Sequence, residues 1–349
     1  MRPVFGRAAR FFSAAMTVFT LLAGCNRTDS KPQSAAEGTQ SVVLYTSVDQ
    51  PFVEPLIAAF ETASGIRVEV ACDSEAGKTS GFLRRLRREA AAPRCDVWWS
   101  SEAFGTVELA GEGLFDAYAS PAAGDIPAEW HDARNRWTAH AARPRVLAYN
   151  PQRINAQELP ATWEDCGQER WRERLVIANP QFGTTRGHVA ALFAYLGKPS
   201  GNALLRALQE NRVLIADGNA QAARMVAQGE ADLAWTDWDD VLAMQRQGSA
   251  IRHVRPRLSD ELPELWIPCT VGLIHNSPHA EAARKLIDYL LSAEVELKLY
   301  ESDSHNVPVR PALRATLGAD VPAPMAPDFG RITSSLSAAA EAAQEALMR

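Results

Sequence analysis

Short apolar runs rich in β-branched residues alternate with amphipathic segments along most of this 349-residue chain. The first three runs, at 42–47, 66–72 and 95–100, are predicted strands, and the segments between them carry apolar residues at helical spacing. In the first predicted helix, which ends at Gly65, one face carries Phe52, Val53, Leu56, Ile57 and Phe60. Strands that alternate with helices are typical of an α/β fold with a mostly parallel sheet flanked by helices.

A second series of the same kind begins at residue 145. Its predicted strands lie at 145–150, 175–180, 212–218 and 231–236, with helices between the later ones, and a further strand at 266–274 precedes two more helices. The second of these is an Ala-rich helix at 334–347. Because single hydrophobic cores stop growing at roughly 250–300 residues, two series over this length predict two lobes.

The first 25 residues have the pattern of an export signal. Arg2, Arg7 and Arg10 precede an apolar run from Phe11 to Ala23. A basic start and a short apolar run are typical of a secretory signal peptide, and the run is too short for a permanent membrane span. The tetrad LAGC resembles the bacterial lipobox, which implies cleavage before Cys25 and a lipid on its sulfur. We therefore expect an exported lipoprotein, anchored to a membrane and facing the periplasm or the cell exterior.

Residues 26–40 contain no apolar side chain larger than Ala, so they are predicted to form a flexible linker. The chain has a net charge of −6, which argues against a nucleic-acid partner because phosphate binding depends on concentrated Lys and Arg. The one strongly basic run, RRLRRE at 84–89, is interpreted as the solvated face of a helix or, alternatively, as a docking patch for a partner.

With Cys25 assigned to the lipid, four cysteines remain, namely Cys72, Cys95, Cys166 and Cys269. Their spacing matches no metal motif. An oxidising compartment permits disulfides, and buried free thiols fit the sequence equally well.

Nine phrases, in order, cover roughly residues 42–312: YTSVDQPFVEPLIAAFETASGIRV, CDVWWSSE, EGLFDAY, RVLAYNP, TWEDC, VIANPQFGTTRGHVAALF, GEADLAW, ARKLIDYLLSAE and NVPVR. This succession resembles the extracellular solute-binding proteins of ABC importers, with the type 2 periplasmic binding protein fold. Within them it is nearest to the iron(III)-binding branch that also includes thiamine and hexose-phosphate binders.

The resemblance implies two α/β lobes joined by strand crossovers, which close on a ligand and deliver it to the transmembrane subunits of an ABC permease. By analogy, lobe 1 comprises 41–143 with 270–304, and lobe 2 comprises 144–269 with 305–349. In open parallel sheets, ligands lie beyond the carboxyl ends of the strands, where helix N-termini present free N–H groups. On this basis the predicted ligand-binding residues are Ser47, Asp49, Asp73, Glu75, Thr79, Glu102, Thr184, Thr185, Arg186 and Trp238.

The segment TDWDD, at 236–240, follows a predicted strand and opens a predicted helix. Helix capping explains part of the cluster, with Thr236 or Asp237 as N-cap and Asp239 and Asp240 favoured in the first turn. Three carboxylates within four residues also suit a hard cation, so Asp237, Asp239 and Asp240 are candidate metal ligands.

The segment GTTRG, at 183–187, is the best candidate anion site in the sequence. Thr184 and Thr185 can cap the following helix while its free N–H groups and Arg186 face outward, and capping alone is the alternative interpretation. The segment DSEAGKTSG, at 73–81, mixes donors and acceptors that suit a polar ligand, or it is a solvated loop that caps the next helix. No P-loop frame fits it.

Two departures from the iron-binding branch bear on the ligand. Relatives in that branch commonly carry adjacent tyrosines at the position of TDWDD and a histidine after the first strand, whereas this chain has Trp238 with aspartates, and Asp49. The sequence therefore does not support a ferric site of the tyrosinate type, although a carboxylate-rich metal site remains open. Trp99 and Trp238 beside carboxylates could also hold an organic cation.

We therefore expect a tethered receptor for an ABC importer that performs no chemistry and needs no cofactor. Three ligand classes remain open: ferric iron or another metal with a synergistic anion, a phosphate- or phosphonate-type anion, or an organic cation such as thiamine or a polyamine. An exported enzyme is disfavoured because the chain has no GxSxG and no HExxH motif. A sensor lipoprotein would share the same sequence features.

Overall fold

The computed structural model describes residues 40–72 and 79–348 of the chain. Several predictions lie outside the described residues: the export signal, the lipid site at Cys25, the linker up to residue 39, and the candidate ligand residues Asp73 and Glu75. The fold given below is that of the unit Thr39–Arg349.

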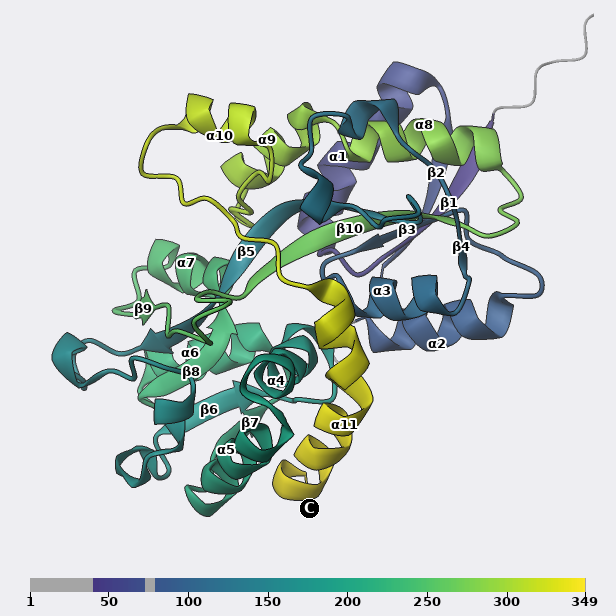
Figure 1. The fold of residues 1–349 in the computed structure, drawn as a ribbon. Coiled ribbons are helices and arrows are strands. Elements are labelled where there is room, and N and C mark those ends of the chain that lie inside the picture. The colour runs from purple at the N-terminus through teal and green to yellow at the C-terminus, as the bar shows by residue number, and fades with distance from the viewer. Residues whose placement is uncertain (1–39, 73–78, 349) are drawn as a thin grey trace, which may run out of the picture. The chain divides into compact units, whose positions relative to one another are not determined.

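The described elements alternate between strand and helix for most of their length (Figure 1). The strands are β1 Ser41–Thr46, β2 Arg67–Cys72, β3 Val97–Ser100, β4 Phe115–Asp116, β5 Thr138–Tyr149, β6 Leu175–Ala178, β7 Leu214–Ala216, β8 Leu233–Asp237, β9 Arg252–Val254 and β10 Trp266–Ile274. The helices are α1 Gln50–Ser64, α2 Ser80–Glu89, α3 Phe104–Gly111, α4 Gly183–Leu196, α5 Lys198–Glu210, α6 Asn219–Gln228, α7 Trp238–Arg246, α8 Ala280–Leu290, α9 Ala293–Glu301, α10 Pro311–Leu317 and α11 Phe329–Leu347.

The strands form two parallel groups joined by two long antiparallel strands. The order of the main path is β2-β1-β3-β10-β5-β8-β6-β7, with β4 added on β10 and β9 on β5. β1 pairs in parallel with β2 and β3, and β6 pairs in parallel with β7 and β8. β5 connects the groups, because its first half pairs with β10 and its second half with β8. The predicted α/β fold is confirmed, but its sheet is mixed, because the antiparallel crossover strands β5 and β10 lie between the two parallel groups.

Local sequence explains the helices that border the first group. α1 buries Val53, Leu56, Ile57 and Phe60 at helical spacing and ends at Gly65, whose φ of 69° lies in the left-handed region that glycine tolerates best. α2 buries one apolar face, made by Phe82, Leu83 and Leu86, while its arginines lie at the other side. This arrangement agrees with the interpretation of RRLRRE as the solvated face of a helix.

The C-terminal helix α11 packs mainly against α4 and α5 and also contacts α3 (Figure 1). It begins five residues before the predicted start at 334 and buries Phe329, Ile332, Leu336, Ala339 and Ala343. Among the described residues no helix combines the length and the apolar character that a membrane crossing requires. All four cysteines of this unit are free thiols, so the alternative of disulfides is not what the structure shows.

Candidate ligand-binding site

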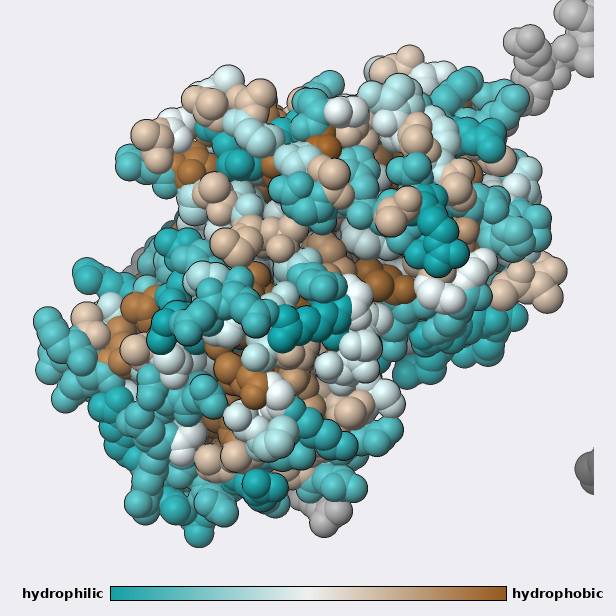
Figure 2. All heavy atoms as spheres, in the orientation of Figure 1, coloured by the Kyte–Doolittle hydropathy of each residue, from teal (hydrophilic) through white to brown (hydrophobic). Residues whose placement is uncertain are grey.

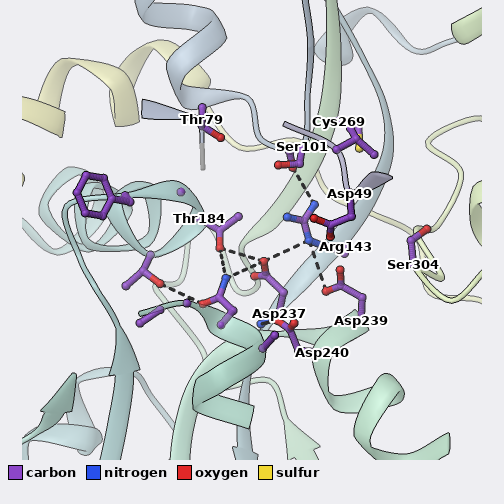
Figure 3. A pocket seen from close by; sticks show the side chains of 18 of the residues that line it. Asp49, Thr79, Ser101, Arg143, Thr184, Asp237, Asp239, Asp240, Cys269 and Ser304 are labelled. Atoms are coloured by element: carbon purple, nitrogen blue, oxygen red, sulfur yellow. Dashed lines mark hydrogen bonds and ion pairs between the residues drawn. The ribbon is translucent and has the colours of Figure 1, made fainter. Parts of the chain in front are cut away.

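A pocket of about 120 Å³ lies where the strands β1, β6 and β8 end and several helices begin (Figure 3). Helices α1, α4, α6 and α7 contribute residues at or next to their N-termini, and β5 and β10 contribute one each. The polar and charged residues that line the pocket are Asp49, Thr79, Ser101, Arg143, Asn179, Thr184, Thr185, Asp217, Asn219, Asp237, Asp239, Asp240, Cys269, Ser304 and Asn306.

Asp237 is the centre of a buried polar network on one side of the pocket. Its carboxylate lies 2.8 Å from Nη1 of Arg145 and 3.2 Å from Nε of Arg143. It also accepts hydrogen bonds from the Thr184 hydroxyl, at 2.9 Å, and from the Asn219 amide, at 3.2 Å. Burial by itself would raise the pKa of Asp237, but the guanidinium groups of Arg145 and Arg143 hold this pKa below its ordinary value. Asp237 is therefore an ionised carboxylate whose charge the protein itself compensates.

Arg143 extends this network across the pocket. Its Nη1 donates to the carbonyl oxygen of Ser101 at 2.8 Å, and its Nε lies 3.5 Å from Asp239 Oδ1. The side chain therefore connects the loop after β3 with the start of α7. In Figure 3, Thr184 and Ser304 lie on opposite sides of Arg143.

The first turns of α4 and α6 face the same pocket, through Gly183, Thr184, Asn219 and Ala220. The residue before α4 is Phe182 and the residue before α6 is Gly218, and neither provides a side-chain cap. N–H groups in the first turn of a helix have no carbonyl partner within the helix, so both termini present donors and a partial positive charge to the pocket.

The predicted capping at the two motifs is confirmed at one and wrong at the other. Asp237 is the N-cap of α7 and forms a capping box with Asp240, as the capping interpretation of TDWDD predicts. Thr184 and Thr185 do not cap α4, because the helix begins one residue earlier, at Gly183, and their hydroxyls donate instead to Asp237 and Asn219. The α4 N–H groups are thereby left to the pocket.

Seven of the predicted site residues line the pocket, namely Asp49, Thr79, Thr184, Thr185, Asp237, Asp239 and Asp240. One oxygen from each of the three aspartates of TDWDD lies within 4.8 Å of the others, close enough to share a cation. Asp49 is the residue before α1 and makes no side-chain cap for that helix.

Four other predicted residues are not among the residues that line the pocket. Glu102 is buried and accepts hydrogen bonds from the N–H groups of Phe104 and Gly105, and burial raises its pKa to about 7. Arg186 forms a two-bond ion pair with Glu108 of α3, at 2.9 and 3.0 Å. Both side chains therefore make their contacts with other residues of the protein.

Ser47 and Trp238 also lie away from the pocket lining. The Ser47 hydroxyl lies within hydrogen-bond distance of the hydroxyls of Ser100 and Ser101, and it accepts from the Ser101 N–H. The Trp238 ring packs against the core beside His305, with 5.4 Å between ring centroids. Trp99, the other candidate aromatic, is fully buried and donates its indole N–H to His140.

The residues that sequence reasoning missed come mostly from the crossover strands and the loop before α10. They are Arg143 and Arg145 on β5, Cys269 on β10, and Ser304 and Asn306, and none was predicted as a site residue, although Arg145 and Asn306 open the phrases RVLAYNP and NVPVR. A signal was nevertheless present, because two arginines in an otherwise apolar strand require partners when the strand is buried. The sequence gives no indication of which carboxylates those partners are.

The sequence and the fold have counterparts among known proteins. A putative 2-aminoethylphosphonate-binding periplasmic protein of Salmonella paratyphi A is 27% identical over 79% of this chain and 81% of its own length. The iron uptake protein A1 of Synechocystis is 24% identical over 84% of this chain and 85% of its own. The ferric binding protein of Campylobacter jejuni superposes with a TM-score of 0.76 at 20% identity, over 87% of this chain and 99% of that one.

These likenesses confirm the two-lobed α/β fold of ferric-binding periplasmic proteins and the predicted class of protein. The family model of bacterial extracellular solute-binding proteins matches residues 42–297, which is most of the chain. The chain therefore belongs to the bacterial extracellular solute-binding protein family.

Proposed function

We propose that this protein captures a small oxyanion of the phosphonate or phosphate class and delivers it to an ABC permease. The observation that carries the proposal is the convergence of two helix N-termini, those of α4 and α6, on one pocket with no side chain capping either of them. Such termini bind phosphate-like groups through their N–H donors and their dipoles. Arg143, which also lines the pocket, adds a charged donor beside them.

The network around Asp237 supports this assignment because it fixes the N-termini of α4 and α6 relative to each other. The Asn219 amide, at the start of α6, donates to the Thr184 hydroxyl of α4 at 2.7 Å, and both side chains bond to Asp237. The two sets of N–H donors are thereby preorganised, which lowers the ordering cost of binding. The pocket of about 120 Å³ suits a ligand of a few non-hydrogen atoms, and a relative named for 2-aminoethylphosphonate binding supports the phosphonate class.

A metal ion with a synergistic anion is a second candidate, favoured by the three carboxylates of Asp237, Asp239 and Asp240 and by relatives named for iron binding. The arginines act against it, because a cation on Asp237 and Asp239 would lie next to the Arg143 guanidinium. In addition, the pocket lining includes no tyrosine and no histidine among the residues that the structure describes.

We also propose the lobes 41–143 with 270–304 and 144–269 with 305–349, which close on the ligand and perform no chemical conversion. The halves of β5 that pair with β10 and with β8, and the packing of α11 on α4 and α5, support these boundaries. A lipid on Cys25 would keep the receptor near its permease. The LAGC tetrad supports the presence of this lipid.

Isothermal titration calorimetry of the full chain, purified in detergent, tests the ligand class. We expect methylphosphonate or phosphate to bind, and Thr184→Val to weaken that binding about tenfold because the network that positions α4 loses its hydroxyl. Ser337→Ala on the exposed face of α11 is the matched control and should bind like the wild type. Binding of ferric or manganous salts that Asp239→Asn abolishes, with no response to phosphonates, would instead support the metal candidate.

A further inference from the structure

Beside Cys269, which Figure 3 shows on the far side of Arg143 from Thr184, the pocket contains a buried acceptor that the protein does not use. Asn306 lines the pocket and is 4% exposed. Its Nδ2 donates to Cys269 Sγ at 3.7 Å, whereas its Oδ1 is buried without a hydrogen-bond partner among the described residues. An unpaired buried carbonyl destabilises the protein, so such an oxygen in a residue that lines a pocket is suited to a donor that arrives with the ligand.

Acidic side chains surround this end of the pocket. Asp49 and Asp239 line it, and in Figure 3 both lie on the Ser304 side of Thr184. Cys269, whose sulfur accepts from Asn306, lines the same pocket as these two carboxylates. Burial raises the pKa of Cys269 to about 12, and among the nearby charges Arg143 lowers this pKa while Asp239 and Asp49 raise it. The carboxylates therefore act at the position of the sulfur that Asn306 contacts.

The two ends of the pocket thus have opposite character. The α4 and α6 end offers N–H donors and helix dipoles, which favour an anion, and the Asn306 end offers a neutral acceptor with carboxylates beside it, which favour a cationic donor. A metal ion fits the second end poorly, because one amide oxygen and carboxylates partly engaged by Arg143 are fewer ligands than a hard cation prefers. An ammonium group needs only acceptors and a negative environment.

We propose that Asn306, with Asp49 and Asp239, forms a subsite for the amino group of a short zwitterionic ligand whose oxyanion is bound at α4 and α6. The inference rests on the proposed function, since it places the second end of the same ligand. Asn306 is then the residue that distinguishes aminoalkylphosphonates from alkylphosphonates of the same size, because an apolar methyl group at its oxygen leaves that oxygen unpaired.

Calorimetry of the full chain with two matched probes tests the subsite. 2-Aminoethylphosphonate and propylphosphonate have the same shape, with an ammonium group in the first where the second has a methyl group. We expect the wild type to prefer the amino compound by at least about tenfold, as a hydrogen bond to a charged group provides. Asn306→Leu should abolish this preference by weakening binding of the amino compound, and urea denaturation of the variant shows that it is folded.

Asn306→Asp is the second variant, because a carboxylate also accepts from an ammonium group. It should keep or strengthen the preference for the amino compound, and Asp49→Asn should reduce it. Equal binding of both probes to the wild type would overturn the subsite while the proposed function stands. So would an Asn306→Asp variant that loses the preference as Asn306→Leu does. If neither probe binds, the proposed function fails and the subsite fails with it.

Discussion

The Asp237 carboxylate and the Arg145 guanidinium form an ion pair of 2.8 Å in which the side chains are 4% and 0% exposed. The two residues are also direct neighbours in the antiparallel register of β5 and β8. Because Thr184, Asn219 and Arg143 bond to the same carboxylate, this pair fixes the geometry of the end of the pocket where α4 and α6 begin. On the face that Figure 2 shows, hydrophilic residues cover much of the surface with apolar residues between them, whereas Asp237 and Arg145 are both buried.

Removal of one partner of this pair should strongly destabilise the protein. Asp237→Ala leaves Arg145 charged in the interior, and we expect a loss of about 3–5 kcal/mol in the free energy of unfolding, measured by urea denaturation. Arg212→Ala is the matched control, because Arg212 pairs with Glu173 at 2.6 Å on the surface, with the side chains 72% and 57% exposed. Its loss should be about 0–1 kcal/mol. Similar small losses for both variants would show that Asp237 does not have the stabilising role assigned to it.

His188 should make stability depend on pH. Its ring lies between Trp163 and Trp235, with centroids 4.2 and 4.7 Å away, and neither ring nitrogen has a partner among the described residues. Burial, assisted by the charge of Arg145, lowers the pKa of His188 well below its usual 6.5. The unfolded chain therefore takes up a proton below about pH 6.5 that the folded chain does not, and stability is lost as the pH falls from 6.5 toward the folded pKa.

The variant His188→Leu isolates this contribution. Each such histidine contributes a slope of about 1.4 kcal/mol per pH unit in this range, so the variant should show a pH dependence that is shallower by that amount. Urea denaturation between pH 7 and pH 5 measures it. An unchanged slope would mean that His188 is protonated in the folded protein or that water pairs with it.

Gly187 should tolerate no larger side chain, because α4 approaches α3 closely there. A Cβ at this position would lie 2.0 Å from Cδ2 of Phe104, which is buried. We expect Gly187→Ala to cost about 1–3 kcal/mol by overpacking, and the added change Phe104→Leu to recover part of it. At Gly111, the last residue of α3, an added Cβ meets nothing within 4 Å. Gly111→Ala should therefore be neutral or stabilise the protein by about 0.4–1 kcal/mol, and thermal melts of both variants compare them.

The cysteines should react as free thiols of unequal access. Cys72 is exposed, whereas Cys95, Cys166 and Cys269 are buried. In a chain with Cys25→Ser, we expect rapid labelling of Cys72 and labelling of the other three cysteines only after denaturation without reductant, followed by mass spectrometry. Fewer labelled thiols in denaturant would show that disulfides form after all.

Much of the architecture could be predicted from periodicity, because strands such as 266–274 and helices such as 51–65 have apolar patterns that can be buried in only one way. The observed β10 has the predicted bounds, and α1 lies within one residue of its predicted position. Helices α5 and α9 were not predicted, although Leu204, Leu205 and Leu208 of α5 are spaced for burial. Only Gly197 separates α5 from α4, so the sequence has no loop segment that would indicate where one helix ends and the next begins.

The candidate site, like the fold, could be predicted from the sequence only in part. Local sequence identifies chain segments that follow strands, so Asp49, Thr184 and the aspartates of 237–240 were predicted, and they line one pocket. Local sequence does not reveal which charges compensate each other. From the sequence, Asp237 is therefore a candidate metal ligand. In the structure it pairs with Arg143 and Arg145, which lie more than 90 positions away in the chain.

The sequence by itself determined the class of fold, the order of most of its elements and the edge of the sheet at which the pocket lies, because these follow from hydrophobic periodicity and from the ends of strands. Only the tertiary structure decided the character of the pocket. The pairing of β5 with β8 and β10 brings Arg143, Arg145 and Cys269 to it, and the loop before α10 brings Asn306. The physical reason is that charge compensation and hydrogen bonding depend on distances between residues that are remote in sequence, which no local pattern records.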